Sequence, residues 1–235
     1  MKLLLISNST NAGEEYLDYP KNNIQQFLGN KPVRALFIPY AAVTFSFDDY
    51  EKKVNERFSE IGHAVESIHH VANPLEAVEN AEAIVVGGGN TWQLLKMMQE
   101  QGLVERVKEK ANSGTPYIGW SAGSNMACPT IRTTNDMPIL QPQSFNACGL
   151  ISFQINPHYL DANPEGHAGE TREARIEEFI EVNPDMHVMG LREGTMLWIE
   201  NNVIQLIGPR KARIFKKGMI PRELGPDDDF SFLLS

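Results

Sequence analysis

Short apolar runs alternate along the first half of the chain with segments whose apolar residues recur every three or four positions. The apolar runs predict strands at residues 3–6, 33–39, 64–69, 83–86 and 116–120. The periodic segments predict helices at residues 21–28, 48–61, 74–80, 91–102 and 104–113. Because strands alternating with such helices are joined by right-handed crossovers, we expect a mostly parallel sheet flanked by helices.

The second half of the chain is less regular. Residues 129–150 are rich in Pro, Thr, Asn and Gln, which predicts a long loop. We predict a helix at residues 171–182 and strands at residues 151–155, 187–191, 196–200, 203–207 and 212–215. Tight turns separate the last three strands, so we expect them to form a short antiparallel edge. The whole pattern predicts one three-layer α/β domain over residues 1–235.

Composition and charge narrow the class of protein. Hydrophobic residues make up 42% of the chain, which is ordinary for a globular domain, and the net charge is −9. An acidic surface argues against a nucleic-acid or anionic-membrane partner, and the apolar run at residues 3–6 is too short for a signal peptide or a membrane span. Two cysteines are too few for a disulfide framework, so we expect reduced thiols in a cytoplasmic protein. The oligomeric state, monomer or homodimer, stays open.

A serine flanked by glycines follows the fifth predicted strand. The segment Gly119-Trp120-Ser121-Ala122-Gly123 fits the pattern G-x-S-x-G and precedes small residues that can begin a helix. This is the strand-turn-helix setting of a nucleophile elbow, in which the glycines remove side chains that would clash around a strained serine. Amides at the start of the helix favour developing negative charge. Ser121 is therefore a candidate nucleophile, and the alternative is an incidental serine in a tight turn.

A glycine run follows another predicted strand, at Gly87-Gly88-Gly89. Ligands bind at this edge of open α/β sheets, where glycines expose backbone amides. A phosphate loop would need the spacing G-x-x-x-x-G-K-[ST] or G-x-G-x-x-G, and neither is present. We therefore favour an oxyanion hole made by Gly88 and Gly89 together with the amide of Ala122, the residue after the serine. A turn needed only for packing is the alternative.

A serine nucleophile needs a base and an acidic partner for that base. Among the six histidines, His158 stands out because it follows the predicted strand 151–155 and sits in a turn stiffened by proline. His167 is the second candidate base. Glu193, after the predicted strand 187–191, and Asp136, in the long loop, are both candidates for the acidic partner. The chain has no H-E-x-x-H motif and no Cys/His ligand cluster, so we expect neither a metal nor another cofactor.

Six segments of the chain match motifs of a known family. They are residues 3–10 (LLLISNST), 86–91 (VGGGNT), 117–123 (YIGWSAG), 128–138 (CPTIRTTNDMP), 154–158 (QINPH) and 164–172 (PEGHAGETR). They occur in order over most of the chain, and with them the chain resembles the peptidase E family, the α-aspartyl dipeptidases. The resemblance implies a fold similar to that of class I glutamine amidotransferases, with serine replacing the nucleophilic cysteine. It also implies that the substrate is a small peptide with N-terminal aspartate.

The resemblance assigns roles to the candidate residues. The family nucleophile falls on Ser121, the family histidine on His158, and the third member of the site on a position that matches either Glu193 or Asp136. We favour Glu193 as the residue that orients the imidazole. Asp136 is then the expected partner of the α-ammonium group of the substrate.

An aspartate side chain in the substrate requires a cation, and two arginines are candidates. Arg172 begins the predicted helix 171–182 and shares a face with its apolar residues. A cation at this end of a helix opposes the helix dipole, so an inward-facing arginine there suggests a buried anion, and the alternative is an arginine that extends to solvent. Arg132 is the second candidate, and Asn90 is a further polar group beside the glycine run. The loop at residues 162–170 contains two glycines and a proline and is a candidate lid.

Two other functions stay open. A cyanophycinase-like or isoaspartyl peptidase would act on β-linked aspartyl peptides with the same fold. A non-catalytic relative would bind an amino acid as a sensor, although the presence of serine, histidine and both carboxylates together argues against it.

Overall fold

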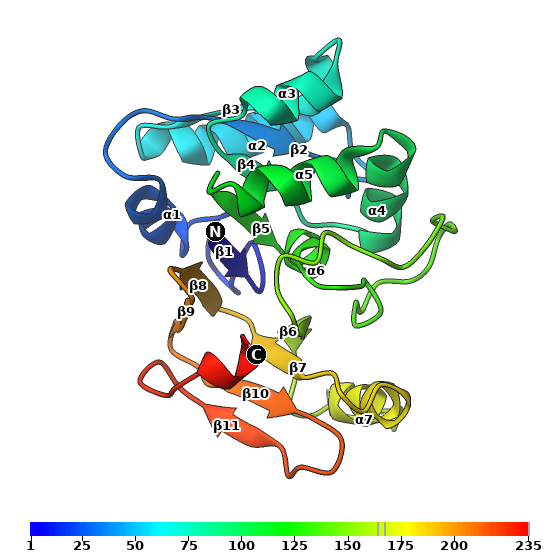
Figure 1. Cartoon of the computed structure of the whole chain (residues 1–235). Helices are drawn as coiled ribbons and strands as arrows, with labels where there is room; N and C mark the ends of the chain where they lie inside the picture. The colour runs from blue at the N-terminus through cyan, green and yellow to red at the C-terminus, as the bar shows by residue number, and fades with distance from the viewer. Residues whose placement is uncertain (164, 167, 235) are drawn as a thin grey trace.

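The computed structural model describes residues 1–163, 165–166 and 168–234, arranged around two sheets (Figure 1). The main sheet has seven strands in the order β3-β2-β4-β5-β1-β8-β9. Its strands are β1 (Lys2–Ile6), β2 (Arg34–Ile38), β3 (Ala64–Ser67), β4 (Ile84–Val86), β5 (Tyr117–Trp120), β8 (Met196–Glu200) and β9 (Val203–Ile207). The first five run parallel, and β8 and β9 add an antiparallel hairpin beside β1.

Helices cover both faces of the main sheet. They are α1 (Lys21–Leu28), α2 (Phe47–Glu60), α3 (Pro74–Asn80), α4 (Thr91–Glu100), α5 (Leu103–Asn112) and α6 (Ala122–Ala127), with the short 3-10 helix η1 (Ile68–His70) after β3. Alternate side chains of each strand enter opposite layers. In β1, Leu4 and Ile6 belong to the apolar layer formed with α1 and α2, whereas Leu3 and Leu5 belong to the layer formed with α3 to α6. The prediction of a mostly parallel sheet flanked by helices is confirmed.

A second sheet of four strands lies in the lower half of Figure 1, in the order β11-β10-β7-β6. Its elements are β6 (Gln154–Tyr159), β7 (Val188–Arg192), β10 (Ala212–Phe215) and β11 (Arg222–Leu224), with α7 (Arg172–Val182) and the 3-10 helix η2 (Ser231–Leu233). One face of this sheet, including Ile155 and Leu191, joins the core of the main sheet. The other face packs on α7 through Tyr159, Ile176 and Phe215.

The second sheet corrects two predictions. The last three predicted strands do not share one antiparallel edge, because β10 pairs with β7 instead of β9. The turn from β9 to β10 passes through Gly208, whose φ is 127° and which packs so closely on Gly194 that a side chain would clash with the carbonyl oxygen of Gly194. The predicted strand 151–155 in fact spans Gln154–Tyr159 and includes Pro157. Proline is tolerated there because β6 is an edge strand, and the amides on its outer side form no hydrogen bonds with another strand.

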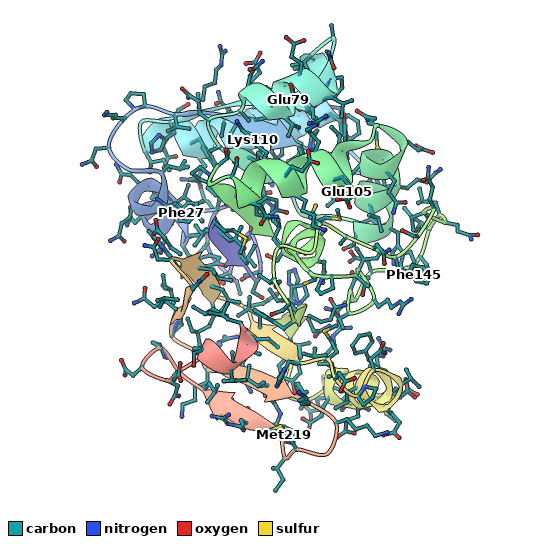
Figure 2. All side chains as sticks on the ribbon, in the orientation of Figure 1. Phe27, Glu79, Glu105, Lys110, Phe145 and Met219 are labelled. Carbon is teal, nitrogen blue, oxygen red and sulfur yellow. The ribbon has the colours of Figure 1, made fainter. Side chains whose placement is uncertain are left out.

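A long loop, residues 128–153, connects α6 to β6 and confirms the predicted loop at 129–150. Its tip lies against α4, where Phe145 (labelled in Figure 2) packs edge-on against Trp92. The carboxyl ends of β4, β5 and β1 lie side by side, because these three strands are parallel neighbours in the main sheet. Of the helices in the described part of the chain, none has the length and apolarity needed to cross a bilayer.

Candidate active site

Ser121 occupies a strained turn between β5 and α6. Its φ and ψ are 52° and −113°, and it precedes the first residue of α6. Neither flanking glycine leaves room for a side chain. A Cβ on Gly119 would lie 2.4 Å from the carbonyl oxygen of Gly123, and a Cβ on Gly123 would lie 2.1 Å from the carbonyl oxygen of Val86. The backbone amide of Ser121 donates to the carbonyl oxygen of Ile6, at the end of β1. The serine is thus held in an unusual conformation by close packing from both neighbouring strands.

His158 reaches Ser121 from the second sheet. It lies at a register shift of β6 against β7, and its φ is 53°. Its backbone amide donates to the hydroxyl of Ser7 at 3.0 Å, and this hydroxyl donates in turn to the carbonyl oxygen of Leu191 at 2.7 Å. The imidazole Nε2 is 2.9 Å from the Oγ of Ser121. The sequence prediction placed His158 after a strand, whereas the histidine lies inside the strand, where the irregular pairing turns its side chain towards the serine.

Glu193 supplies the acidic partner of His158. Its Oε1 is 2.8 Å from Nδ1 of the imidazole. The two residues meet because β6 and β7 are parallel neighbours, so that the residue after β7 lies beside the end of β6. The turn that carries Glu193 is fixed by Asn8, whose Oδ1 accepts a hydrogen bond from the amide of Gly194 at 2.8 Å.

This geometry allows proton transfer from the serine. An ionised carboxylate only accepts hydrogen bonds, so Glu193 selects the imidazole tautomer with the proton on Nδ1. Nε2 then has a lone pair directed at the hydroxyl of Ser121 and is able to accept its proton. Both side chains of the His158–Glu193 pair are partly exposed, at 38% and 40%, so the site is open to a ligand from solvent.

Asp136 has no contact with the imidazole. Its Oδ2 accepts hydrogen bonds from the backbone amide and the hydroxyl of Thr91, at 2.7 and 2.6 Å, and from the hydroxyl of Thr134 at 3.1 Å. Its carboxylate therefore lies at the N-terminus of α4, where the helix dipole favours negative charge. No described residue donates a hydrogen bond to Oδ1, and Asp136 borders the same cavity as Ser121.

The glycine run after β4 lies directly beside Ser121. A Cβ on Gly88 would be 3.0 Å from the Cβ of Ser121. The backbone amides of Gly88, Gly89 and Ala122 donate to no acceptor within the described part of the chain. Unpaired amides of this kind, next to a nucleophile, are suited to binding an oxyanion.

Tyr50 of α2 fixes the orientation of the glycine run. Its hydroxyl donates to the carbonyl oxygen of Gly88 at 2.9 Å, and it accepts from Nε1 of Trp120 at 3.1 Å. In a trans peptide the carbonyl and the following amide point in opposite directions. Anchoring the Gly88 oxygen on Tyr50 therefore directs the amide of Gly89 away from Tyr50.

The three candidate substrate-binding residues differ in position. Arg172 is half-buried at the start of α7 and borders a cavity of about 380 Å³ with Ser121, His158 and Asp136. Burial, together with the nearby Arg175, lowers the pKa of Arg172, although an arginine stays charged at neutral pH. It has no ion pair with any described residue.

Arg132 and Asn90 lie outside that cavity. Arg132 is exposed, with its guanidinium 5.2 Å from the ring centre of Phe145. The side chain of Asn90 caps α4 by accepting from the amide of Gln93, and it donates to the carbonyl oxygen of Met137. These two hydrogen bonds fix Asn90 at the start of α4, and its role in substrate binding stays a prediction.

Ser121 and His158 line two cavities, one on each side. One is the cavity bordered by Arg172 and Asp136. The other has a volume of about 620 Å³ and is lined by aromatic residues of the N-terminal half. A ligand bound at Ser121 therefore has space on two sides of the hydroxyl.

Sequence reasoning did not identify Ser7, Asn8 or Tyr50 as parts of the site. Ser7 and Asn8 lie in the matching segment 3–10, whose position at the end of a strand was the available signal. Pro164 and His167 fall outside the described residues, so the second candidate base and the lid stay predictions. A group that could hold a metal, Asp48, Glu51, His69 and His70, has its ligand atoms within 4.8 Å of one another, but none of the four lines the cavities at Ser121.

Comparisons with known proteins agree with one another. The sequence profile of peptidase family S51 matches residues 3–207. A relative named peptidase E from Nostoc sp. is 52% identical over 233 residues, which cover 99% of this chain and 96% of the relative. Peptidase E of Salmonella arizonae is 49% identical over 218 residues, 93% of this chain and 95% of the relative.

Solved structures share the fold. A peptidase from an acI-B1 Actinobacterium superposes with a TM-score of 0.72 at 20% identity, over 98% of this chain and 96% of that structure. A putative peptidase E protein from Listeria monocytogenes gives a TM-score of 0.66 at 19% identity, over 88% of this chain and 98% of that structure.

Proposed function

This chain belongs to peptidase family S51, and from that premise we propose that it is a serine dipeptidase that releases N-terminal aspartate from dipeptides and short peptides. The resemblance to the peptidase E family noted from the motifs is confirmed. The single observation that carries the proposed specificity is the cavity beside Ser121, in which no described residue forms an ion pair with Arg172 or donates a hydrogen bond to Oδ1 of Asp136.

An N-terminal aspartyl residue carries an ammonium group and a carboxylate close together. In the proposed complex the carboxylate pairs with Arg172 and the ammonium with Oδ1 of Asp136. A guanidinium binds a carboxylate through two parallel hydrogen bonds, which an uncharged side chain does not replace. A substrate with N-terminal leucine would cover the half-buried Arg172 without supplying an anion, and this cost is the proposed source of specificity.

The chemistry follows from the contacts of Ser121. His158 takes the hydroxyl proton while Oγ attacks the carbonyl carbon of the aspartyl residue, and Glu193 stabilises the imidazolium that forms. The amides of Gly88, Gly89 and Ala122 bind the oxyanion. His158 then gives its proton to the leaving amine, and water, activated by the same imidazole, releases aspartate from the serine ester. We place this reaction in the cytoplasm, in keeping with two buried cysteines that form no disulfide.

Hydrolysis of a small peptide panel tests the proposal. We expect the protein to cleave Asp-Leu with a kcat/KM at least about 100-fold above that for Leu-Leu, because the two substrates differ in the group that meets Arg172. Isoaspartyl-Leu should be cleaved no better than Leu-Leu, since its scissile carbonyl is displaced by one methylene. Faster release from isoaspartyl-Leu would replace the proposed substrate with a β-linked one, and folded protein that cleaves none of the three would refute a peptidase of aspartyl substrates.

Tyr50→Phe tests how the oxyanion site is held. Loss of the hydroxyl releases the carbonyl oxygen of Gly88, so the amide of Gly89 loses its fixed direction. We expect kcat for Asp-Leu to fall about tenfold with a change in KM of less than about threefold, because the oxyanion develops only in the transition state. Tyr40→Phe is the matched control: Tyr40 is also buried and donates to Gln101, but it lines neither cavity at Ser121. An equal loss in both variants would mean that the effect is one of general stability.

A further inference from the structure

The larger cavity at Ser121 has no part in the binding of the aspartyl residue as proposed above. Its volume is about 620 Å³, within the range of small-molecule sites in proteins. Most of its walls come from segments before residue 90, together with Trp120, whereas Arg172, Asp136 and Glu193 do not line it. Because it shares Ser121 and His158 with the smaller cavity, it lies where the group leaving from the scissile bond would go.

Four aromatic side chains form much of the wall of this cavity. They are Tyr16, Phe45, Tyr50 and Trp120. Tyr16 and Trp120 both donate to the hydroxyl of Tyr50, which ties the three rings together. Burial raises the pKa of Tyr50 to about 12 and raises that of Tyr16 as well, so both phenols stay neutral at physiological pH. A rigid wall of this kind favours an apolar or aromatic side chain.

One lysine, Lys53, lies at the edge of this aromatic wall. Its Nζ is 4.2 Å from the ring centre of Tyr16, a cation–π contact that holds the ammonium at the cavity. It is the only lysine or arginine among the lining residues in the described chain, and it has no carboxylate partner there. Asp49, one turn earlier on α2, also lines the cavity, but its carboxylate accepts a hydrogen bond from the hydroxyl of Ser46.

We propose that this cavity binds the residue that follows aspartate in the substrate, with its side chain against the aromatic wall and its free α-carboxylate paired with Lys53. The inference rests on the proposed function, because it uses cleavage after an N-terminal aspartate to define the leaving residue. Lys53 then makes the protein prefer dipeptides, whose leaving residue ends in a carboxylate. A longer or amidated peptide has no anion at that position.

Lys53→Met, assayed on Asp-Phe and Asp-Phe amide, tests the role of the lysine. For the wild type we expect a kcat/KM about tenfold higher for Asp-Phe than for the amide, a size suited to one partly exposed charge-assisted hydrogen bond. In Lys53→Met this preference should fall to less than about twofold, because KM for Asp-Phe rises. The kcat/KM for Asp-Phe amide should stay at the wild-type value. Lys52→Met is the matched control, since Lys52 precedes Lys53 on α2, is exposed and does not line the cavity. It should keep the wild-type preference.

The outcomes separate the two proposals. If the wild type cleaves neither peptide, the proposed function fails. If it cleaves both equally well, or if Lys53→Met slows both to the same extent, aspartyl cleavage stands and the role of Lys53 is refuted. The aromatic wall is tested in parallel with wild-type protein on Asp-Phe and Asp-Gly, for which we expect at least about a tenfold difference in kcat/KM from burial of the ring. Equal rates on those two peptides would refute binding of the side chain in this cavity.

Discussion

Ser121→Ala is expected to lower kcat for Asp-Leu by about 10⁴- to 10⁶-fold, close to the background of the assay. The Oγ of Ser121 is the atom that would form the ester with the aspartyl group, and alanine provides no replacement. His158 would remain beside Glu193 but would have no hydroxyl to deprotonate. Substrate binding should change little, because Arg172 and Asp136 are untouched. Steady-state hydrolysis of Asp-Leu, with binding measured by calorimetry on the variant, checks both parts.

The matched comparison for Ser121→Ala is the double variant with His158→Ala. Residues that act as one unit lose activity together, so the double variant should be no slower than the slower single variant. If the two losses multiply instead, Ser121 and His158 act independently, and the proposed proton transfer between them is wrong. Circular dichroism of all three variants checks that the secondary structure of the protein is retained.

Most of the first half of the fold could be predicted from the sequence because its signals are local. Apolar runs and helical periodicity identify β1 to β5 and α1 to α5 to within a few residues. The second half depends on which strands pair, and a strand's own residues do not encode its partner. Val203–Ile207 and Ala212–Phe215 have similar apolar patterns, yet they belong to different sheets. The second sheet was therefore missed, although its strands, apart from β11, were expected.

The active site, like the fold, could be predicted only where the signal is local in the sequence. The nucleophile elbow is a local pattern, and its glycines have the close contacts that were expected of them. The choice between Glu193 and Asp136 depends on the parallel pairing of β6 with β7, which brings Glu193 to the imidazole and leaves Asp136 at the N-terminus of α4. Ser7 and Asn8 act through hydrogen bonds to residues more than 150 positions away, which no local pattern shows.

Arg172→Met is expected to reduce kcat/KM for Asp-Leu by about 10³-fold while leaving the slow cleavage of Leu-Leu within about threefold of the wild type. The size follows from the loss of a half-buried, bidentate partner for the substrate carboxylate. Arg132→Met is the matched control, because Arg132 lies over Phe145 outside the cavity at Ser121. A loss on Asp-Leu that appears with Arg132→Met and not with Arg172→Met would move the aspartate site to the long loop.

The stability of Arg172→Met distinguishes a binding residue from a structural one. In the free protein Arg172 is a half-buried cation that forms no ion pair with the described residues, and it lies at the N-terminus of α7, where the helix dipole disfavours positive charge. Methionine removes this cost, so the free energy of unfolding should stay the same or rise by about 0.3–1 kcal/mol even as activity falls. Thermal unfolding without substrate measures this directly. An arginine needed for folding would instead lower the melting temperature and slow Asp-Leu and Leu-Leu together, which would refute its assignment to the substrate carboxylate.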